Sequence, residues 1–66
     1  MNLKLSMELD NSAFETGNDQ TRSGSEIARI LRAQADLMEH GNVAVGDVMS
    51  LRDANGNRVG NWTVED

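Results

Sequence analysis

The sequence predicts a single α+β domain in which one helix packs on a three-stranded antiparallel sheet. Three observations support this fold class: an alternating segment near the N-terminus, a capped amphipathic segment in the middle, and an Asn-Gly pair between two β-like segments near the C-terminus. A chain of 66 residues is too short to build a second independent core. We therefore expect one small domain that spans residues 1–66.

The first predicted strand lies near the N-terminus. Leu3, Leu5, Met7 and Leu9 alternate with polar or charged residues. Because successive side chains of a strand point to opposite faces, this period of two places the four apolar side chains on one face of a sheet. The pattern predicts a strand at residues 3–9.

The segment that follows, at about residues 10–24, is rich in Asn, Ser, Thr, Gly and charged residues. This composition is typical of a loop, and we expect a long, flexible one. Phe14 is the only Phe in the chain. We expect it to pack beneath the following helix, because isolated aromatic residues in small domains usually fill the core.

A helix is predicted to begin near Ser23. Ser23-Gly24-Ser25-Glu26 matches a capping box, in which the serine hydroxyl accepts from an early helical N–H and the glutamate reaches back to the cap. Gly41 supplies the expected end of the helix. Mainly apolar residues recur at helical spacing and form one broad side of this helix. They are Ile27, Ile30, Leu31, Gln34, Ala35, Leu37 and Met38.

A β-hairpin is predicted near the C-terminus. Residues 47–53 and 57–64 flank Asn55-Gly56, which is a strong signal for a two-residue type I′ turn. With this turn, Asp53 lies opposite Arg58. We expect an ion pair between these two side chains, next to the turn.

The same register tests whether the hairpin has one apolar face. It places Met49 opposite Trp62 and Leu51 opposite Gly60, so the apolar face holds Met49, Leu51, Trp62 and Val64. The opposite face, which we expect to be solvated or lightly covered, holds Val48, Ser50, Arg52, Val59, Asn61 and Thr63.

The predicted element order is β-α-β-β. If the helix carries the chain back across the sheet, the first and second strands point the same way, and the third lies between them, antiparallel to both. The predicted strand order is therefore 1-3-2. The expected core consists of Leu3, Leu5, Met7, Leu9, Ile27, Ile30, Leu31, Met38, Met49, Leu51, Trp62 and Val64.

Composition narrows the possible functions. Six Lys and Arg residues stand against eleven Asp and Glu residues, for a formal net charge of −5, which disfavours direct binding to nucleic acid or to anionic membranes. The chain has no cysteine and one histidine, so we expect no disulfide, no metal site and no cofactor. We also expect no enzymatic activity and, in the absence of a signal-peptide pattern, a cytoplasmic location.

Three motifs resemble a family of small phage and prophage proteins of uncharacterised function. They are the "LDN-x-AF" segment at residues 9–14, the "ARIL" segment at residues 28–31, and the "LRD-x-NGN-x-VG-x-W" segment at residues 51–62. The resemblance covers most of the chain and brings no catalytic residues with it. It implies a phage origin and a place in the host cytoplasm; small acidic phage proteins are often inhibitors of host machinery, including anti-CRISPR proteins.

The leading functional hypothesis is an inhibitor that binds a host defence or nucleic-acid-handling protein, such as a nuclease complex. An acidic surface is attracted to basic nucleic-acid channels, and complementary charge speeds association. The candidate contact charges are Glu8, Asp10, Glu15, Asp19, Asp47, Glu65 and Asp66. For any one of them, a role in solubility alone is the simpler interpretation.

The alternative hypothesis is a structural or regulatory phage accessory protein that self-associates. The expected core is thin for a domain that is stable alone. A homodimer would form through strand pairing or through face-to-face packing of the sheets. In such a dimer Val48, Val59 and Thr63 would become buried.

Overall fold

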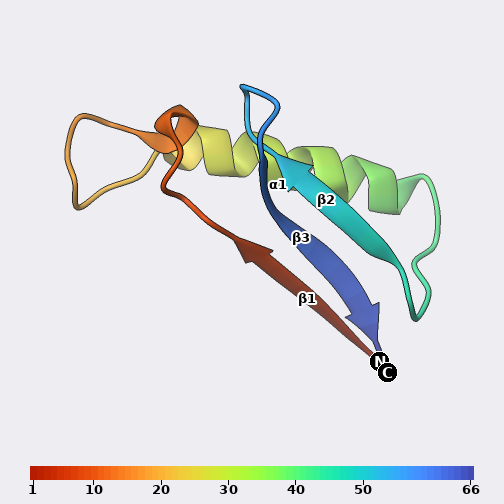
Figure 1. The fold of residues 1–66 in the computed structure, drawn as a ribbon. Coiled ribbons are helices and arrows are strands. Elements are labelled where there is room, and N and C mark those ends of the chain that lie inside the picture. The colour runs from red at the N-terminus through yellow and green to blue at the C-terminus, as the bar shows by residue number, and fades with distance from the viewer.

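The computed structural model covers residues 1–66 and contains one helix on a three-stranded sheet (Figure 1). The sheet is antiparallel with the order β1-β3-β2, so the predicted fold class and strand order are confirmed. The elements are β1 (Asn2–Met7), the short 3-10 helix η1 (Ser12–Phe14), α1 (Gly24–Glu39), β2 (Val48–Arg52) and β3 (Arg58–Glu65).

The strand register follows the prediction except next to the turn. Met49 pairs with Trp62 and Leu51 pairs with Gly60, as the hairpin pattern predicted. On the other side of β3, β1 pairs without interruption along its whole length. The register of β2 shifts between Leu51 and Arg52, and this irregularity changes the turn.

The predicted type I′ turn is wrong. That turn needs a positive φ at both central residues, whereas Gly56, at 83°, is the only residue of the turn with a positive φ. The carbonyl oxygen of Asp53 accepts from Gly56 N–H at 3.0 Å, and Asp53 N–H donates to the carbonyl oxygen of Asn57 at 2.9 Å. The hairpin therefore closes with a longer turn that ends in a left-handed glycine, a common alternative to the two-residue turn.

The predicted ion pair between Asp53 and Arg58 is also wrong. The longer turn moves Arg58 opposite Arg52 and leaves the Asp53 side chain beneath the turn, where it is buried. There its carboxylate accepts from the N–H groups of Asn55 and Asn57, each at 2.9 Å. Aspartate commonly accepts such local N–H groups in turns, and here it stabilises the turn instead of a cross-strand contact.

The core lies between α1, η1 and the face of the sheet that the helix covers. It consists of Phe14, Ile30, Leu51, Val59, Trp62 and Val64. Phe14 is completely buried, which confirms its predicted packing. The indole N–H of Trp62 donates to Gln34 Oε1 at 2.8 Å, so the polar atom of the buried tryptophan is satisfied.

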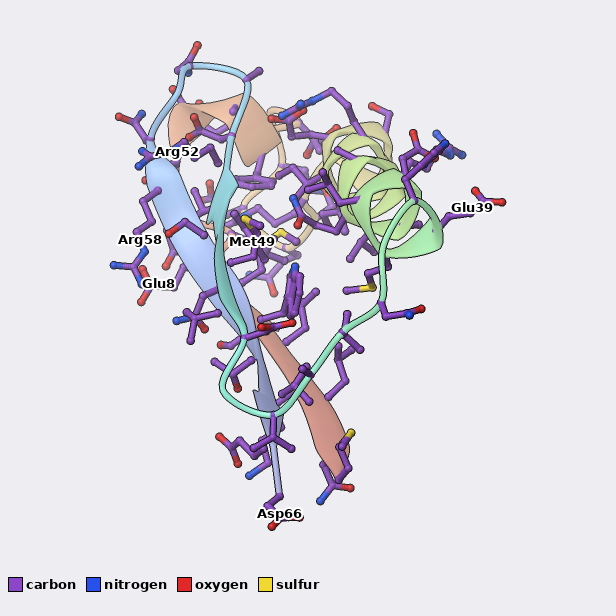
Figure 2. The ribbon with its side chains drawn as sticks, turned by 90° about the vertical axis from the view of Figure 1, so that its right-hand side faces the viewer. Glu8, Glu39, Met49, Arg52, Arg58 and Asp66 are labelled. Atoms are coloured by element: carbon purple, nitrogen blue, oxygen red, sulfur yellow. The ribbon has the colours of Figure 1, made fainter.

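Several residues expected in the core are exposed instead: Leu3, Leu5, Leu31 and Met49. The helix lies mainly over the turn end of the sheet, while the first residues of β1 extend beyond it, as Figures 1 and 2 show from two directions. Val59, expected on the outer face, joins the core. The register shift beside Arg52 interrupts strict alternation at that point.

The segment predicted as a flexible loop is hydrogen-bonded at both ends. It contains η1, and Ser23 N–H donates to the carbonyl oxygen of Phe14 at 2.8 Å. Arg22 Nε donates to the carbonyl oxygen of Leu9 at 2.7 Å. These contacts connect the exit of β1 to the start of α1.

Gly60 is required where β1 and β3 approach each other most closely. A Cβ at this position would overlap the carbonyl oxygen of Ser6 and would lie 2.9 Å from Met7 Cα. Because both are backbone atoms, Gly60→Ala should displace β1 and lower the free energy of unfolding by about 1–3 kcal/mol in urea denaturation. Gly24→Ala is the control, since a Cβ there meets nothing within 4 Å; equal losses for both variants would contradict this assignment.

Candidate functional site

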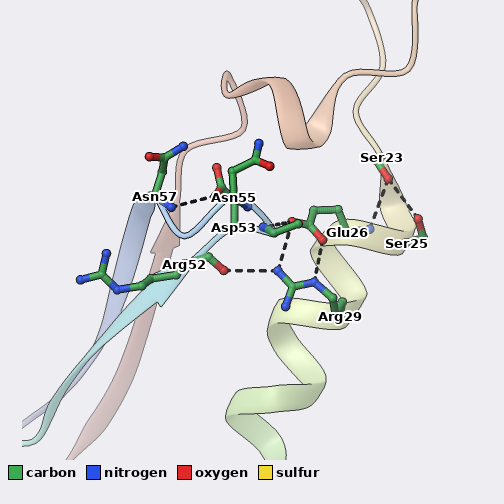
Figure 3. Close-up of polar contacts among 9 residues, drawn as sticks. Ser23, Ser25, Glu26, Arg29, Arg52, Asp53, Asn55 and Asn57 are labelled. Carbon is green, nitrogen blue, oxygen red and sulfur yellow. Dashed lines mark hydrogen bonds and ion pairs between the residues drawn. The ribbon is translucent and has the colours of Figure 1, made fainter.

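Glu26 is a buried carboxylate that joins the start of α1 to the hairpin turn (Figure 3). The helix cap is formed as predicted, because Glu26 N–H donates to Ser23 Oγ at 3.2 Å. The Glu26 side chain does not reach back to the cap, which corrects the expected capping box. It accepts instead from Ala54 N–H at 2.7 Å and from Arg29 Nε and Nη2 at 2.7 and 3.1 Å.

Asp53 is the second buried carboxylate of the same region. Besides the two N–H groups of the turn, it accepts from Asn11 Nδ2 at 3.0 Å. Asn11 directly precedes η1, so this contact holds the exit of β1 against the hairpin. Together with Glu26 and Arg29, these residues form a polar cluster across three segments of the chain, which we call the turn brace.

The electrostatics of the turn brace favour ionised carboxylates. The hydrogen bonds from Arg29, with a further one from Ala54, hold the pKa of Glu26 below its ordinary value. Burial alone would raise the pKa of Asp53, but the hydrogen bonds from Asn11, Asn57 and Asn55 outweigh that effect and lower it. Neither pKa is shifted toward neutrality, as a general acid or base would require. The turn brace therefore stabilises the fold.

An apolar groove lies at the other end of α1, between the end of the helix and β2. Its volume is about 300 Å³. Met49 points toward the helix side of the sheet at this level (Figure 2), while Leu37 and Val48 are 53% and 61% exposed. The groove is lined by Leu37, Met38, Asn42, Val43, Asp47, Val48, Met49 and Trp62.

The sequence pattern identified part of the groove but assigned it to the core. Leu37 and Met38 belong to the predicted apolar side of the helix, and Met49 and Trp62 to the predicted apolar face of the hairpin. Periodicity shows which residues share a face, but it does not show where a 16-residue helix ends above the sheet. The missing information was the position of the helix.

Three of the seven candidate acidic residues lie together. Asp10, Glu15 and Asp19 line a polar hollow of about 240 Å³ in the segment around η1. Arg22 lines the same hollow, and its Nη2 atom lies 3.6 Å from Asp10 Oδ1. The three acidic side chains are exposed and share one hollow with Arg22.

Of the other four candidates, Glu65 and Asp66 are neighbours at the C-terminus, and Asp47 and Glu8 lie in other segments. Glu65 pairs with Lys4 at 2.9 Å, which lowers the pKa of Glu65. Asp66 lies beside the N-terminus, at the opposite end of the molecule from the segment around η1 (Figure 1). Asp47 accepts from Ala44 N–H at 2.9 Å and lines the apolar groove. Glu8 lies on the outer face of the sheet near Arg58 (Figure 2).

No group of three or more His, Asp or Glu side chains lies close enough together to hold a metal ion. No helix has the length and apolar character needed to cross a lipid bilayer. His40 follows the last residue of α1, where its Nδ1 atom lies 2.7 Å from the carbonyl oxygen of Asp36. Its position stabilises the end of the helix.

The turn brace makes stability depend on pH. Since the folded-state pKa values of Glu26 and Asp53 lie below their ordinary values of 4.5 and 3.8, their contribution is fully present above those values. It is lost as the pH falls through the folded-state values. Urea unfolding between about pH 7 and about pH 3 should show a smaller loss of stability for Asp53→Asn than for the unmodified protein. Glu39→Gln, which changes an exposed carboxylate, should keep the full dependence, and an unchanged slope in Asp53→Asn would contradict the role of this group.

Comparison with models of protein families, with curated proteins and with solved structures finds no match to this chain. Its function must therefore be inferred from its own surfaces and contacts.

Proposed function

We propose that this protein acts by binding another protein, and that the apolar groove at the end of α1 is its main contact surface. The observation that carries this proposal is the exposure of Leu37 and Val48 at the rim of a groove with mostly hydrophobic walls. Contiguous exposed apolar surface with polar surroundings is a common feature of protein–protein contact sites. The fully hydrogen-bonded carboxylates of the turn brace have a structural role that leaves the groove as the best-defined site.

The groove has a chemistry that favours a particular kind of partner. Its walls suit one or two large apolar side chains, which would gain about 25 cal/mol for each Å² of apolar surface removed from water. Asp47 lies in the wall, and the chain carries a net charge of −5. A partner segment with an apolar anchor and basic flanking residues is therefore complementary, because opposite charge speeds encounter and limits the choice of partner.

The narrower proposal is an inhibitor of a host defence or nucleic-acid-handling protein, similar in mode of action to anti-CRISPR proteins. Two observations support it: the three motifs that resemble small phage proteins, and the negative surface around Asp10, Glu15 and Asp19. Proteins that handle nucleic acid present basic channels, to which such a surface is attracted. The setting of this activity would be the host cytoplasm.

The groove can be tested with paired substitutions that leave the core intact. The tagged protein is used to capture partners from host lysate, and each captured protein is then measured against purified variants. Leu37→Ser combined with Val48→Ser should weaken binding at least about tenfold, because the apolar anchor loses its contact surface. Leu31→Ser is the matched control, since Leu31 is a comparably exposed leucine of the same helix that does not line the groove.

Two results separate the proposal from its failure. A partner that is lost by the groove variant and retained by Leu31→Ser supports the proposal, provided that thermal unfolding of both variants resembles that of the unmodified protein. A partner that binds the groove variant with unchanged affinity contradicts it.

The contribution of the negative surface is tested separately. Replacing Asp10, Glu15 and Asp19 by Asn, Gln and Asn should lower the association rate and reduce its dependence on salt, because exposed charges act mainly on encounter. Stopped-flow association at low and high salt measures both effects. Neutralising Glu65 and Asp66 at the opposite end is the control, and equal effects of the two sets would mean that only net charge matters.

A further inference from the structure

β1 is an edge strand whose outer side is uncovered. It pairs with β3 on one side only, and its pairing runs without a bulge from Asn2 to Met7. Leu3 and Leu5 on this strand are 50% and 39% exposed. The chain has no proline to interrupt the edge. A regular, exposed edge with apolar side chains is a template for pairing with another strand.

The hydrogen-bonding groups that point outward can be identified from the alternation of the strand. Glu8 N–H donates to the carbonyl oxygen of Val59 at 2.7 Å, so the main-chain groups of Glu8 point toward β3. In an antiparallel strand the main-chain groups of successive residues point to opposite edges, so those of Lys4 and Ser6 also point toward β3. The main-chain groups of Leu3, Leu5 and Met7 therefore point to the open edge and are available to another strand.

The opposite edge of the sheet is less suited to pairing. β2 has five residues, and its register shifts between Leu51 and Arg52. The carbonyl oxygen of Arg52 already accepts from Arg29 Nη2 at 3.4 Å. A short edge with an irregular register and an occupied carbonyl is poorly suited to strand addition, so β1 is the better docking edge.

The sequence of β1 is complementary to itself in one antiparallel register. Two copies related by a two-fold axis at Ser6 place Lys4 opposite Glu8 of the second copy, twice by symmetry, and Leu5 opposite Met7 on the apolar face. An axis at Lys4 would place two lysines together, and an axis at Leu5 would place Lys4 opposite Ser6. Of these three registers, only the one centred on Ser6 pairs opposite charges. It brings Lys4, within β1, opposite Glu8, the first residue after β1.

We propose that β1 pairs with β1 of a second copy in this register and forms a two-fold homodimer with a continuous six-stranded sheet. The partner is specified by three features: an open edge of matching length, outward main-chain groups on the apolar residues, and the Lys4–Glu8 complementarity. Lys4 is 66% exposed even while it contacts Glu65, so it can reach a second carboxylate. The apolar groove lies beside β2, at the far edge of the sheet, and stays uncovered.

The test uses charge reversal at the two facing positions. In sedimentation-velocity and light-scattering measurements over a concentration series, the unmodified protein should show a reversible monomer–dimer equilibrium. Lys4→Glu alone and Glu8→Lys alone should each weaken dimerisation about tenfold, since each replaces two attractive contacts by repulsive ones. Mixing these two variants should restore dimerisation, because each copy then presents the charge that the other lacks.

Glu65→Gln is the control, since it removes the contact of Lys4 within its own chain and leaves Glu8 unchanged; dimerisation should remain. Restoration on mixing also separates weakened pairing from a folding defect, which mixing does not repair. A protein that stays monomeric at every concentration overturns the proposal. A dimer that is unaffected by both single substitutions, or a mixture that does not recover, overturns it as well. None of these results affects the groove, whose binding is measured with different variants.

Discussion

The arrangement of helix and sheet depends on the turn brace. Of the six buried apolar residues of the core, only Ile30 belongs to α1, so the helix has few fully buried apolar contacts of its own. The Glu26 carboxylate adds a direct contact from the first turn of α1 to the main chain of the hairpin at Ala54. Removing one partner of a buried, hydrogen-bonded charge lowers stability much more than the intact contact raises it. A shift of the helix that separated Glu26 from Ala54 would be costly for the same reason, so this contact favours one relative position of helix and hairpin.

The position of the helix leaves part of the sheet face uncovered. The turn end is covered by α1 and η1, with Phe14 completely buried between them. Toward the chain termini, the helix and the sheet diverge (Figure 1), and Leu3 and Leu5 of β1 stay exposed there. The groove beside β2 therefore follows from the position of the helix, whereas the open edge of β1 follows from the strand order β1-β3-β2, which gives β1 only one neighbour.

Sequence patterns predicted the elements better than their contacts. Alternation identified β1, helical spacing with a serine cap identified α1, and Asn55-Gly56 identified the hairpin, because each pattern is a local consequence of backbone geometry. The turn type was missed, because the Asp53 side chain supplies hydrogen bonds that favour a longer turn. Both buried carboxylates were misassigned, in part because one partner of each, Ala54 for Glu26 and Asn11 for Asp53, lies far away in the sequence.

The core list shows the same limit. Leu3 and Leu5 have the correct period for an apolar face, and they lie on it, but nothing in the chain covers them. Periodicity reports the orientation of a side chain and carries no information about what lies above it. The groove was not predicted for this reason, although four of its residues were correctly assigned to apolar faces. The acidic candidates were chosen by charge alone, and the fold brings only three of them together.

The location of the two open surfaces on opposite edges of one sheet has a consequence for affinity. A homodimer formed through β1 would carry two identical grooves at its outer edges, held at a fixed separation by a continuous sheet. When a target presents two copies of its own site at a matching distance, the second contact becomes intramolecular. Overall binding can then exceed that of a single groove by a factor of about 10²–10⁴. A protein of this size could in this way combine modest individual contacts into tight, avidity-based binding to a symmetric assembly while binding weakly to its isolated subunits.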